Sequence, residues 1–208
     1  MIALAREQGF SVWLGWGLPL RGWALAMQGQ GEEGIAQIHE GMAAYRAAGA
    51  EMGRTYFLAL LADAYRKMGR VEEGLIALTE GLAIVEKTGE RLYEAELHRL
   101  KGQLTLQKFQ VSSSKFQVPS TQHQTPSTQA EAEAEACFLK AIEIAQRQQA
   151  KSLELRAVMS LSRLWQQQGK KDEARQMLAE IYGWFTEGFD TADLQEARAL
   201  LEELSYKS

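Results

Sequence analysis

The sequence lacks several features that would point to particular classes of protein. Its 208 residues include a single cysteine, Cys137, which excludes an internal disulfide and indicates a reducing compartment. Asparagine is absent, so there is no N-glycosylation site. No apolar run reaches the roughly 18 residues that a membrane-spanning helix needs, and the first residues turn polar too early for a signal peptide. We therefore expect a cytoplasmic protein.

Charge and chemistry are equally restrictive. The net charge of −4 and the pI of about 5.5 give no drive toward nucleic acid or an anionic membrane. The histidines, His39, His98 and His123, fall on separate segments without metal-ligand spacing. Cys137 borders an apolar helical stripe and is expected to be a small core or boundary residue. We expect no catalytic residue, no metal and no cofactor, and hence no enzyme.

One motif matches a nucleotide-binding pattern but lacks the sequence context that such a site requires. Residues Gly29 to Gly34 fit G-x-G-x-x-G, but no strand precedes them and Glu32 and Glu33 would repel a phosphate. The segment recurs forty residues later as Gly-Arg-Val-Glu-Glu-Gly, with Val71 at the middle glycine. We interpret both copies as a turn between two helices.

That recurrence belongs to a longer repeat. Three sets of glycines keep a constant step of forty residues: Gly9, Gly49 and Gly89; Gly29 and Gly69; Gly41 and Gly81. Apolar residues between Val71 and Lys87 recur at steps of three and four, which predicts an amphipathic helix. The same spacing over 56–68 predicts a helix before it, and the glycines end each helix as C-caps. The repeating unit is therefore helix A, tight turn, helix B, turn.

The frame then places each element. The preceding unit has helix A at about 13–28 and helix B at about 32–48, and Pro19 should kink that helix A or delay its start. A seven-residue duplication rich in Ser, Thr, Gln and Pro predicts a disordered low-complexity insertion at 108–129. The insertion adds twenty residues, because Ala134 matches Gly74 at a separation of sixty instead of forty.

The domain organisation follows from that insertion. We expect repeats over 1–107, the insertion at 108–129, and further repeats with a C-terminal capping helix over 130–208. The capping helix should run from about 190 to 204, with Asp190 or Thr191 as its N-cap. Residues 1–8 look like half of a helix B, which suggests that the array continues into a larger protein.

Small, aromatic and glycine positions within each unit resemble the tetratricopeptide repeat. In one unit they are Leu61, Ala62, Tyr65, Gly69, Gly74, Leu78 and Gly81, and in another Leu161, Ser162, Trp165, Gly169, Ala174, Leu178 and Ile181. The resemblance implies an all-α, right-handed solenoid of about four helix pairs. Pairs of the HEAT type, with a period of about 40, are the alternative fold.

Longer strings resemble the C-terminal repeat region of multidomain bacterial adenylate or guanylate cyclases and AAA-type ATPases. They occupy 20–26, 32–38, 56–62, 147–156 and 180–194. The cyclase and ATPase motifs themselves are absent. The resemblance implies a protein-interaction or autoregulatory scaffold in bacterial signalling, whose partner is a protein, a peptide or another domain of the same polypeptide or operon. A repeat domain that senses a small molecule, through Trp16 and Trp23, is the alternative.

In repeats of this type, exposed residues of helix A line the concave surface. The register selects Trp16, Trp23, Tyr56, Asp63, Arg66, Lys67, Arg99, Gln103, Arg156, Arg163 and Gln166. Aromatic residues and arginines would suit a peptide with apolar and acidic parts, although the same tryptophans could pack between helices and the arginines could be solvated. The Lys and Asn clamps of chaperone-tail repeats are missing, since Pro19, Ala59, Trp23 and Asp63 occupy those positions.

Overall fold

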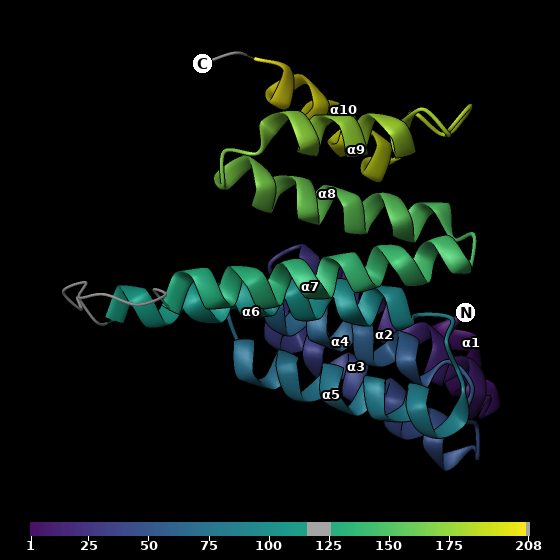
Figure 1. Cartoon of the computed structure of the whole chain (residues 1–208). Coiled ribbons are helices and arrows are strands. Elements are labelled where there is room, and N and C mark those ends of the chain that lie inside the picture. The colour runs from purple at the N-terminus through teal and green to yellow at the C-terminus, as the bar shows by residue number, and fades with distance from the viewer. Residues whose placement is uncertain (116–125, 207–208) are drawn as a thin grey trace. The chain divides into compact units, whose positions relative to one another are not determined.

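The computed structural model describes residues 1–115 and 126–206, with the backbone alone for 112–115 and 126–127. These residues fold into helices joined by short connections, and the described ranges contain no strand (Figure 1). The predicted all-α class is therefore confirmed. The chain divides into two compact units, Met1–Leu100 and Lys101–Ser208, and the division falls within one helix, α6.

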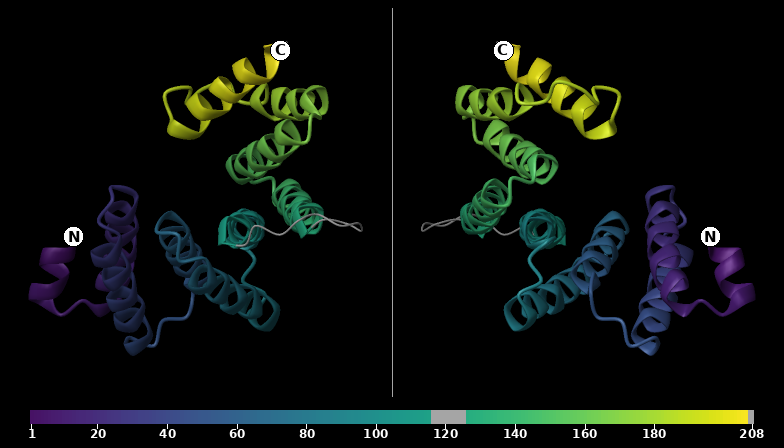
Figure 2. Two further views of the ribbon diagram at one scale, coloured as in Figure 1. Left: turned by 90° about the vertical axis from the view of Figure 1, so that its left-hand side faces the viewer. Right: turned by 90° about the vertical axis from the view of Figure 1, so that its right-hand side faces the viewer.

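Unit 1 holds consecutive helices that pack as neighbours. They are α1 (Ile2–Gln8), α2 (Ser11–Met27), α3 (Gly31–Ala47), α4 (Arg54–Lys67), α5 (Val71–Thr88) and the start of α6 (Glu94–Lys115). Figure 2 shows α2 and α3, and then α4 and α5, as pairs joined by tight turns. Helix B starts at Gly31 in one pair and at Val71 in the next, so the predicted step of forty residues is present in the structure.

Pro19 does not delay the start of its helix. Helix α2 begins at Ser11 and continues through Pro19 to Met27. The ring lies against Gly41 of α3, where even a methyl group would strike it. A proline inside a helix removes one hydrogen bond, and here the missing side chain at Gly41 leaves space for the ring between the two helices.

The same turn follows most of the helices. Its central residue is left-handed, with φ between 69° and 92° at Gly9, Gly29, Gly49, Gly69, Gly89 and Gly169. At all of these except Gly89, the next residue then donates its N–H to the carbonyl five residues earlier, as from Arg70 to Tyr65 (2.9 Å) and from Ala50 to Tyr45 (3.2 Å). This is a Schellman C-cap, which satisfies carbonyls at the helix end, whereas Gly89 makes a single bond from its own N–H to the carbonyl of Val85 (2.9 Å). The C-cap role predicted for Gly69 and Gly89 is confirmed.

The false nucleotide motif is such a turn. Gly29 is its left-handed residue, and Gly31 begins α3 beneath the Met68 side chain. A methyl group on Gly34 would strike the carbonyl oxygen of Gly22, and one on Gly22 would strike that of Gly34. Glycine is needed at these positions because α2 and α3 cross with their backbones in contact. The helix-turn interpretation is confirmed.

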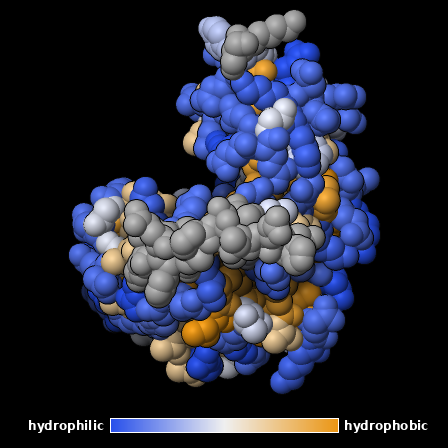
Figure 3. All heavy atoms as spheres, turned by 60° about the vertical axis from the view of Figure 1, so that its left-hand side comes forward, coloured by the Kyte–Doolittle hydropathy of each residue, from blue (hydrophilic) through white to orange (hydrophobic). Residues whose placement is uncertain are grey.

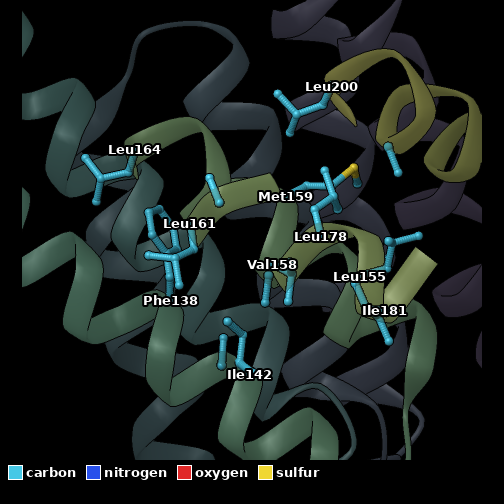
Figure 4. Close-up of a cluster of buried hydrophobic side chains, with 14 of the residues drawn as sticks. Phe138, Ile142, Leu155, Val158, Met159, Leu161, Leu164, Leu178, Ile181 and Leu200 are labelled. Carbon is cyan, nitrogen blue, oxygen red and sulfur yellow. The ribbon is translucent and has the colours of Figure 1, made fainter. Parts of the chain in front are cut away.

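Unit 2 contains the end of α6 together with α7 (Pro126–Arg147), α8 (Lys151–Gln167), α9 (Lys171–Tyr182) and α10 (Ala192–Ser205). Its core is a cluster of buried apolar side chains from α7 to α10 (Figure 4). Phe138 fills the space beside Gly102, and Leu161 of α8 and Leu178 of α9 belong to the same buried cluster. Burying side chains of this size contributes about 1.5–3 kcal/mol each, so this cluster is the main stabilising element of unit 2.

The predicted bounds of the insertion, 108–129, need correction. Helix α6 continues to Lys115 and α7 already starts at Pro126, so both ends of this segment are helical. The reason is local. Lys-Phe-Gln-Val-Ser contains neither proline nor glycine and can prolong α6, whereas proline is well tolerated in the first turn of a helix. Residues 116–125 lie outside the described residues.

The capping helix α10 occupies nearly the predicted range. The sequence offered Asp190 or Thr191 as the N-cap of this helix. The structure has Thr191 there, with an extended backbone. Its hydroxyl does not cap the helix, because it donates to the carbonyl of Gly188 instead (2.7 Å). Leu194, Ala197, Leu200 and Leu204 are buried against the core of unit 2, and Leu201 is partly buried beside them.

Candidate functional site

The predicted binding residues occupy both units. In unit 1 they lie on α2, α4 and α6: Trp16, Trp23, Tyr56, Asp63, Arg66, Lys67 and Arg99. In unit 2 they lie on α6 and α8: Gln103, Arg156, Arg163 and Gln166. Each is half-buried except Lys67, which is exposed. The structure links many of them into polar and aromatic clusters, described next unit by unit.

A polar network joins two successive helices A in unit 1. The indole N–H of Trp23 on α2 donates to one carboxylate oxygen of Asp63 on α4 (2.8 Å). The other oxygen accepts from Arg66 one turn later (2.9 Å from Nε). Trp23 and Asp63 are one full repeat apart in the sequence and therefore hold equivalent positions in their units. The network shows that this register brings helix A residues together.

Aromatic rings form a second cluster beside it. Trp16 lies edge-on to Tyr45 and Phe57, with centroids 6.1 and 5.1 Å away. Tyr56 stacks on Tyr93 with centroids 4.4 Å apart. Such pairs contribute about 0.5–1.5 kcal/mol beyond the apolar area that they bury. Trp16 and Trp23 thus contact neighbouring helices of unit 1, which is one of the two roles that the sequence left open for them.

The predicted arginines already have acidic partners. Arg99 forms a two-pronged ion pair with Glu96, at 2.7 and 2.8 Å, with both side chains nearly buried. In unit 2, Arg156 donates to Asp193 (2.7 Å) and Arg163 to Glu196 (2.6 Å), both on the capping helix α10. These guanidinium groups therefore have partners within the fold, and an acidic ligand would have to compete with the acids of the chain itself.

The two glutamines of unit 2 behave differently. Gln103 donates weakly to the hydroxyl of Ser160 (3.4 Å), while its carbonyl oxygen is buried without a partner in the described residues. Gln166 is half-buried on α8. Among the contacts of the described residues, neither glutamine bonds to Arg156 or Arg163.

Unit 1 also contains a cavity of about 500 Å³ that none of the predicted binding residues lines. Helix α4 supplies its floor through Leu58, Leu61 and Tyr65. Helix α3 supplies one wall, including Met42, and helix α5 the other, including Ile76. We call this the α3/α5 groove. Its volume lies within the range of about 300–1,000 Å³ typical of binding pockets.

Polar groups stand along the rims of this groove. His39 on α3 is within 3.1 Å of the Tyr65 hydroxyl, and the Arg70 guanidinium lies 4.8 Å from the centre of the Tyr65 ring. On the α5 side, Glu73 accepts from Arg70 (2.9 Å). The backbone N–H of Glu73 itself and the Arg70 guanidinium lower the pKa of this carboxyl, and Glu73 in turn raises the pKa of Arg70. The rim is therefore charged at neutral pH.

The sequence carries only a weak signal of the groove. Ile76 lies off the buried stripe of its helix, and 69% of its surface is exposed in the structure. Apolar residues are exposed at several points among hydrophilic ones on the face shown in Figure 3. An isolated exposed isoleucine needs no explanation, so only the neighbouring helices mark Ile76 as part of a site.

Neither a metal-binding cluster nor an activated cysteine is found in the part of the chain that the structure describes. Within residues 1–115 and 126–206, no group of three or more His, Cys, Asp or Glu side chains could hold a metal ion. Burial raises the pKa of the Cys137 thiol, which keeps it protonated and a poor nucleophile at neutral pH. In the same ranges, no helix combines the length and apolar character needed to cross a membrane.

Comparisons with known proteins identify no family or relative for this chain. A scan of the chain against protein-family models finds no match, and a search of curated proteins finds none either.

Proposed function

We propose that this chain is a non-catalytic protein-interaction module built as a solenoid of tetratricopeptide type. The observation that carries the proposal is the recurrence of one helix pair with the same left-handed turn at register-equivalent positions. Repeats of this kind stack into extended surfaces that bind proteins or peptides. Residues outside the turns support it, since equivalent helix A residues such as Trp23 and Asp63 form one connected surface.

The proposed setting is the regulatory tail of a larger bacterial signalling protein. The strings at 20–26, 56–62 and 180–194 support this setting through their resemblance to such tails. The partner would then be another domain of the same polypeptide or operon, or a separate cytoplasmic protein. Sequencing the gene upstream of this reading frame tests the setting, because cyclase or ATPase motifs are expected there.

Protein binding itself can be tested by crosslinking. A photoreactive benzoylphenylalanine placed at Lys67, Ile76 or Gln166, in turn, should form adducts with another polypeptide in the source cell. The same group at Glu86, on the exposed side of α5, is the matched control. Adducts from at least one of the three sites and none from Glu86 would support the proposal. No polypeptide adduct from any site would overturn it.

Small-molecule sensing through Trp16 and Trp23 has less support. Trp16 packs among aromatic rings and the Trp23 N–H is bonded to Asp63, so both indoles are already engaged within the fold. A ligand there would have to displace those contacts.

A further inference from the structure

The α3/α5 groove has an apolar centre that the fold leaves partly exposed. Leu58 and Leu61 of the floor are buried, and Met42 in the α3 wall is half-buried. Ile76 in the opposite wall remains 69% exposed, although its side chain lines the cavity. A partner that covers Ile76 would remove apolar surface from water, which is favourable. The groove thus offers a driving force for binding.

The rims of the groove differ in charge. On α3, Arg46 lines the groove and forms no ion pair within the described residues. On α5, Glu73 and Glu80 line it, and Arg70 and Arg54 pair with them at 2.9 and 3.3 Å. Arg46 therefore faces two carboxylates across an apolar floor, and a basic edge of a partner would share those carboxylates with Arg70 and Arg54. A complementary partner carries an acid along one edge and a base along the other.

The spacing along each wall is that of a helix. His39 and Arg46 are seven residues apart on α3, and Glu73 and Glu80 are seven apart on α5. Seven residues span about two turns, or about 10.5 Å. Between each rim pair lie the apolar wall residues, Met42 on α3 and Ile76 on α5. Both rows therefore match the two-turn repeat of an amphipathic helix lying between them.

An extended peptide fits this groove less well. Its backbone N–H and C=O groups would need partners, and the walls are helices whose own backbone groups are already bonded. A helix satisfies its backbone internally and presents only side chains, which suits an apolar floor with charged rims.

We propose that the α3/α5 groove docks an amphipathic helix of a partner protein, with an apolar stripe over Ile76, a carboxylate edge beside Arg46 and a basic edge beside Glu73 and Glu80. This inference rests on the proposed function as an interaction module and names the partner's chemistry. It places binding on the helix B side of the repeats, away from the helix A residues selected by the sequence register.

Two fluorescein-labelled peptides of about 18 residues, long enough to hold a helix, test the proposal with the purified full chain. Both carry leucines at i, i+3, i+4 and i+7. The mixed peptide has glutamates along one edge of that stripe and lysines along the other, whereas the control peptide has lysines along both. Fluorescence anisotropy should show tighter binding of the mixed peptide by about two- to fivefold, the effect of one rim ion pair. Exchanging the two edges of the mixed peptide is not a control, because a helix that binds in the reverse direction restores the match.

Variants of the chain sharpen the test. R46E makes both rims acidic, so it should reverse the order and favour the all-lysine peptide. I76E should weaken the mixed peptide about tenfold or more through lost apolar burial. L92E is the matched control, because Leu92 is 71% exposed but lies between α5 and α6, outside the groove.

The outcomes separate the two proposals. Equal affinity for both peptides, an unchanged order in R46E, or equal losses in I76E and L92E would overturn helix docking in the groove. Binding of neither peptide at millimolar concentration would overturn it as well. In each case, polypeptide adducts from Lys67 or Gln166 would leave the interaction function standing.

Discussion

Replacing Gln149 by glycine should stabilise this protein. Gln149 is the one residue other than glycine with positive φ in the described ranges, at 55°. It stands sixty positions after Gly89 and a hundred after Gly49, and so holds the turn position that glycine fills in earlier repeats. The turn itself is intact, because the N–H of Ala150 donates to the carbonyl of Ala145 (2.9 Å). A glycine at this position would keep that bond and remove the backbone strain.

The magnitude follows from two opposing terms. The left-handed conformation costs an ordinary residue about 1–2 kcal/mol. Glycine also makes the unfolded chain more flexible, which lowers the free energy of unfolding by about 0.5–1 kcal/mol. The Gln149 side chain is exposed and makes no hydrogen bond or ion pair with the described residues, so little else is lost. We therefore expect Gln149→Gly to stabilise the chain by about 0.5–1 kcal/mol.

Urea denaturation followed by circular dichroism measures this change as a rise in midpoint at constant slope. Hydrogen exchange at the Ala150 amide reports the turn directly and should slow. The reciprocal variant, Gly49→Gln, should lose a similar amount, because a side chain at Gly49 meets nothing and only the backbone resists it. The reasoning fails if Gln149→Gly is neutral or destabilising while Gly49→Gln also has no effect.

Three sets of substitutions and one reactivity measurement test other contacts. A double-mutant cycle of Trp23→Phe and Asp63→Ala should show a coupling of about 1 kcal/mol, since it isolates their hydrogen bond; a coupling near zero in urea melts would contradict the network. Gly22→Ala should destabilise by about 1–3 kcal/mol, because its methyl group strikes the backbone of Gly34; an unchanged midpoint would contradict the close crossing of α2 and α3. The pKa of Glu73 is lowered from 4.5, so its stabilising effect is present above that pH and is lost as the pH falls through the lower folded value; Glu73→Gln should flatten the acid side of the profile of melting temperature against pH, and an identical profile would refute this. Burial raises the pKa of Cys137, so at pH 8 its thiol should react with Ellman's reagent more slowly in the folded chain than in urea, and stability should fall as the pH rises above 9.0; equal rates would show that the thiol is accessible.

Local features could be predicted well from the sequence. Gly69 and Gly89 ended helices as expected, because a left-handed C-cap depends on the absence of a side chain at one position. The bounds of the insertion were less predictable. Its composition indicated disorder, but the ends of α6 and α7 extend into it because no helix-breaking residue follows Leu106 until Pro119.

The roles of the candidate site residues depended on contacts between distant parts of the chain. Register correctly placed Trp23 and Asp63 at equivalent positions, but it could not show that they bond to each other. Nor could it show that Arg156 and Arg163 meet Asp193 and Glu196, because partners on a helix so distant in the sequence leave no local pattern.

The sequence by itself determined an all-α chain, a repeat with a step of forty and the turns that separate its helices. Those features follow from apolar periodicity and from glycine conformation, which act over a few residues. The tertiary structure alone decided which charged side chains are paired and where Ile76 lies. The α3/α5 groove exists only because α3 and α5 both pack against α4, and the packing of three helices is a property that no single segment of sequence contains.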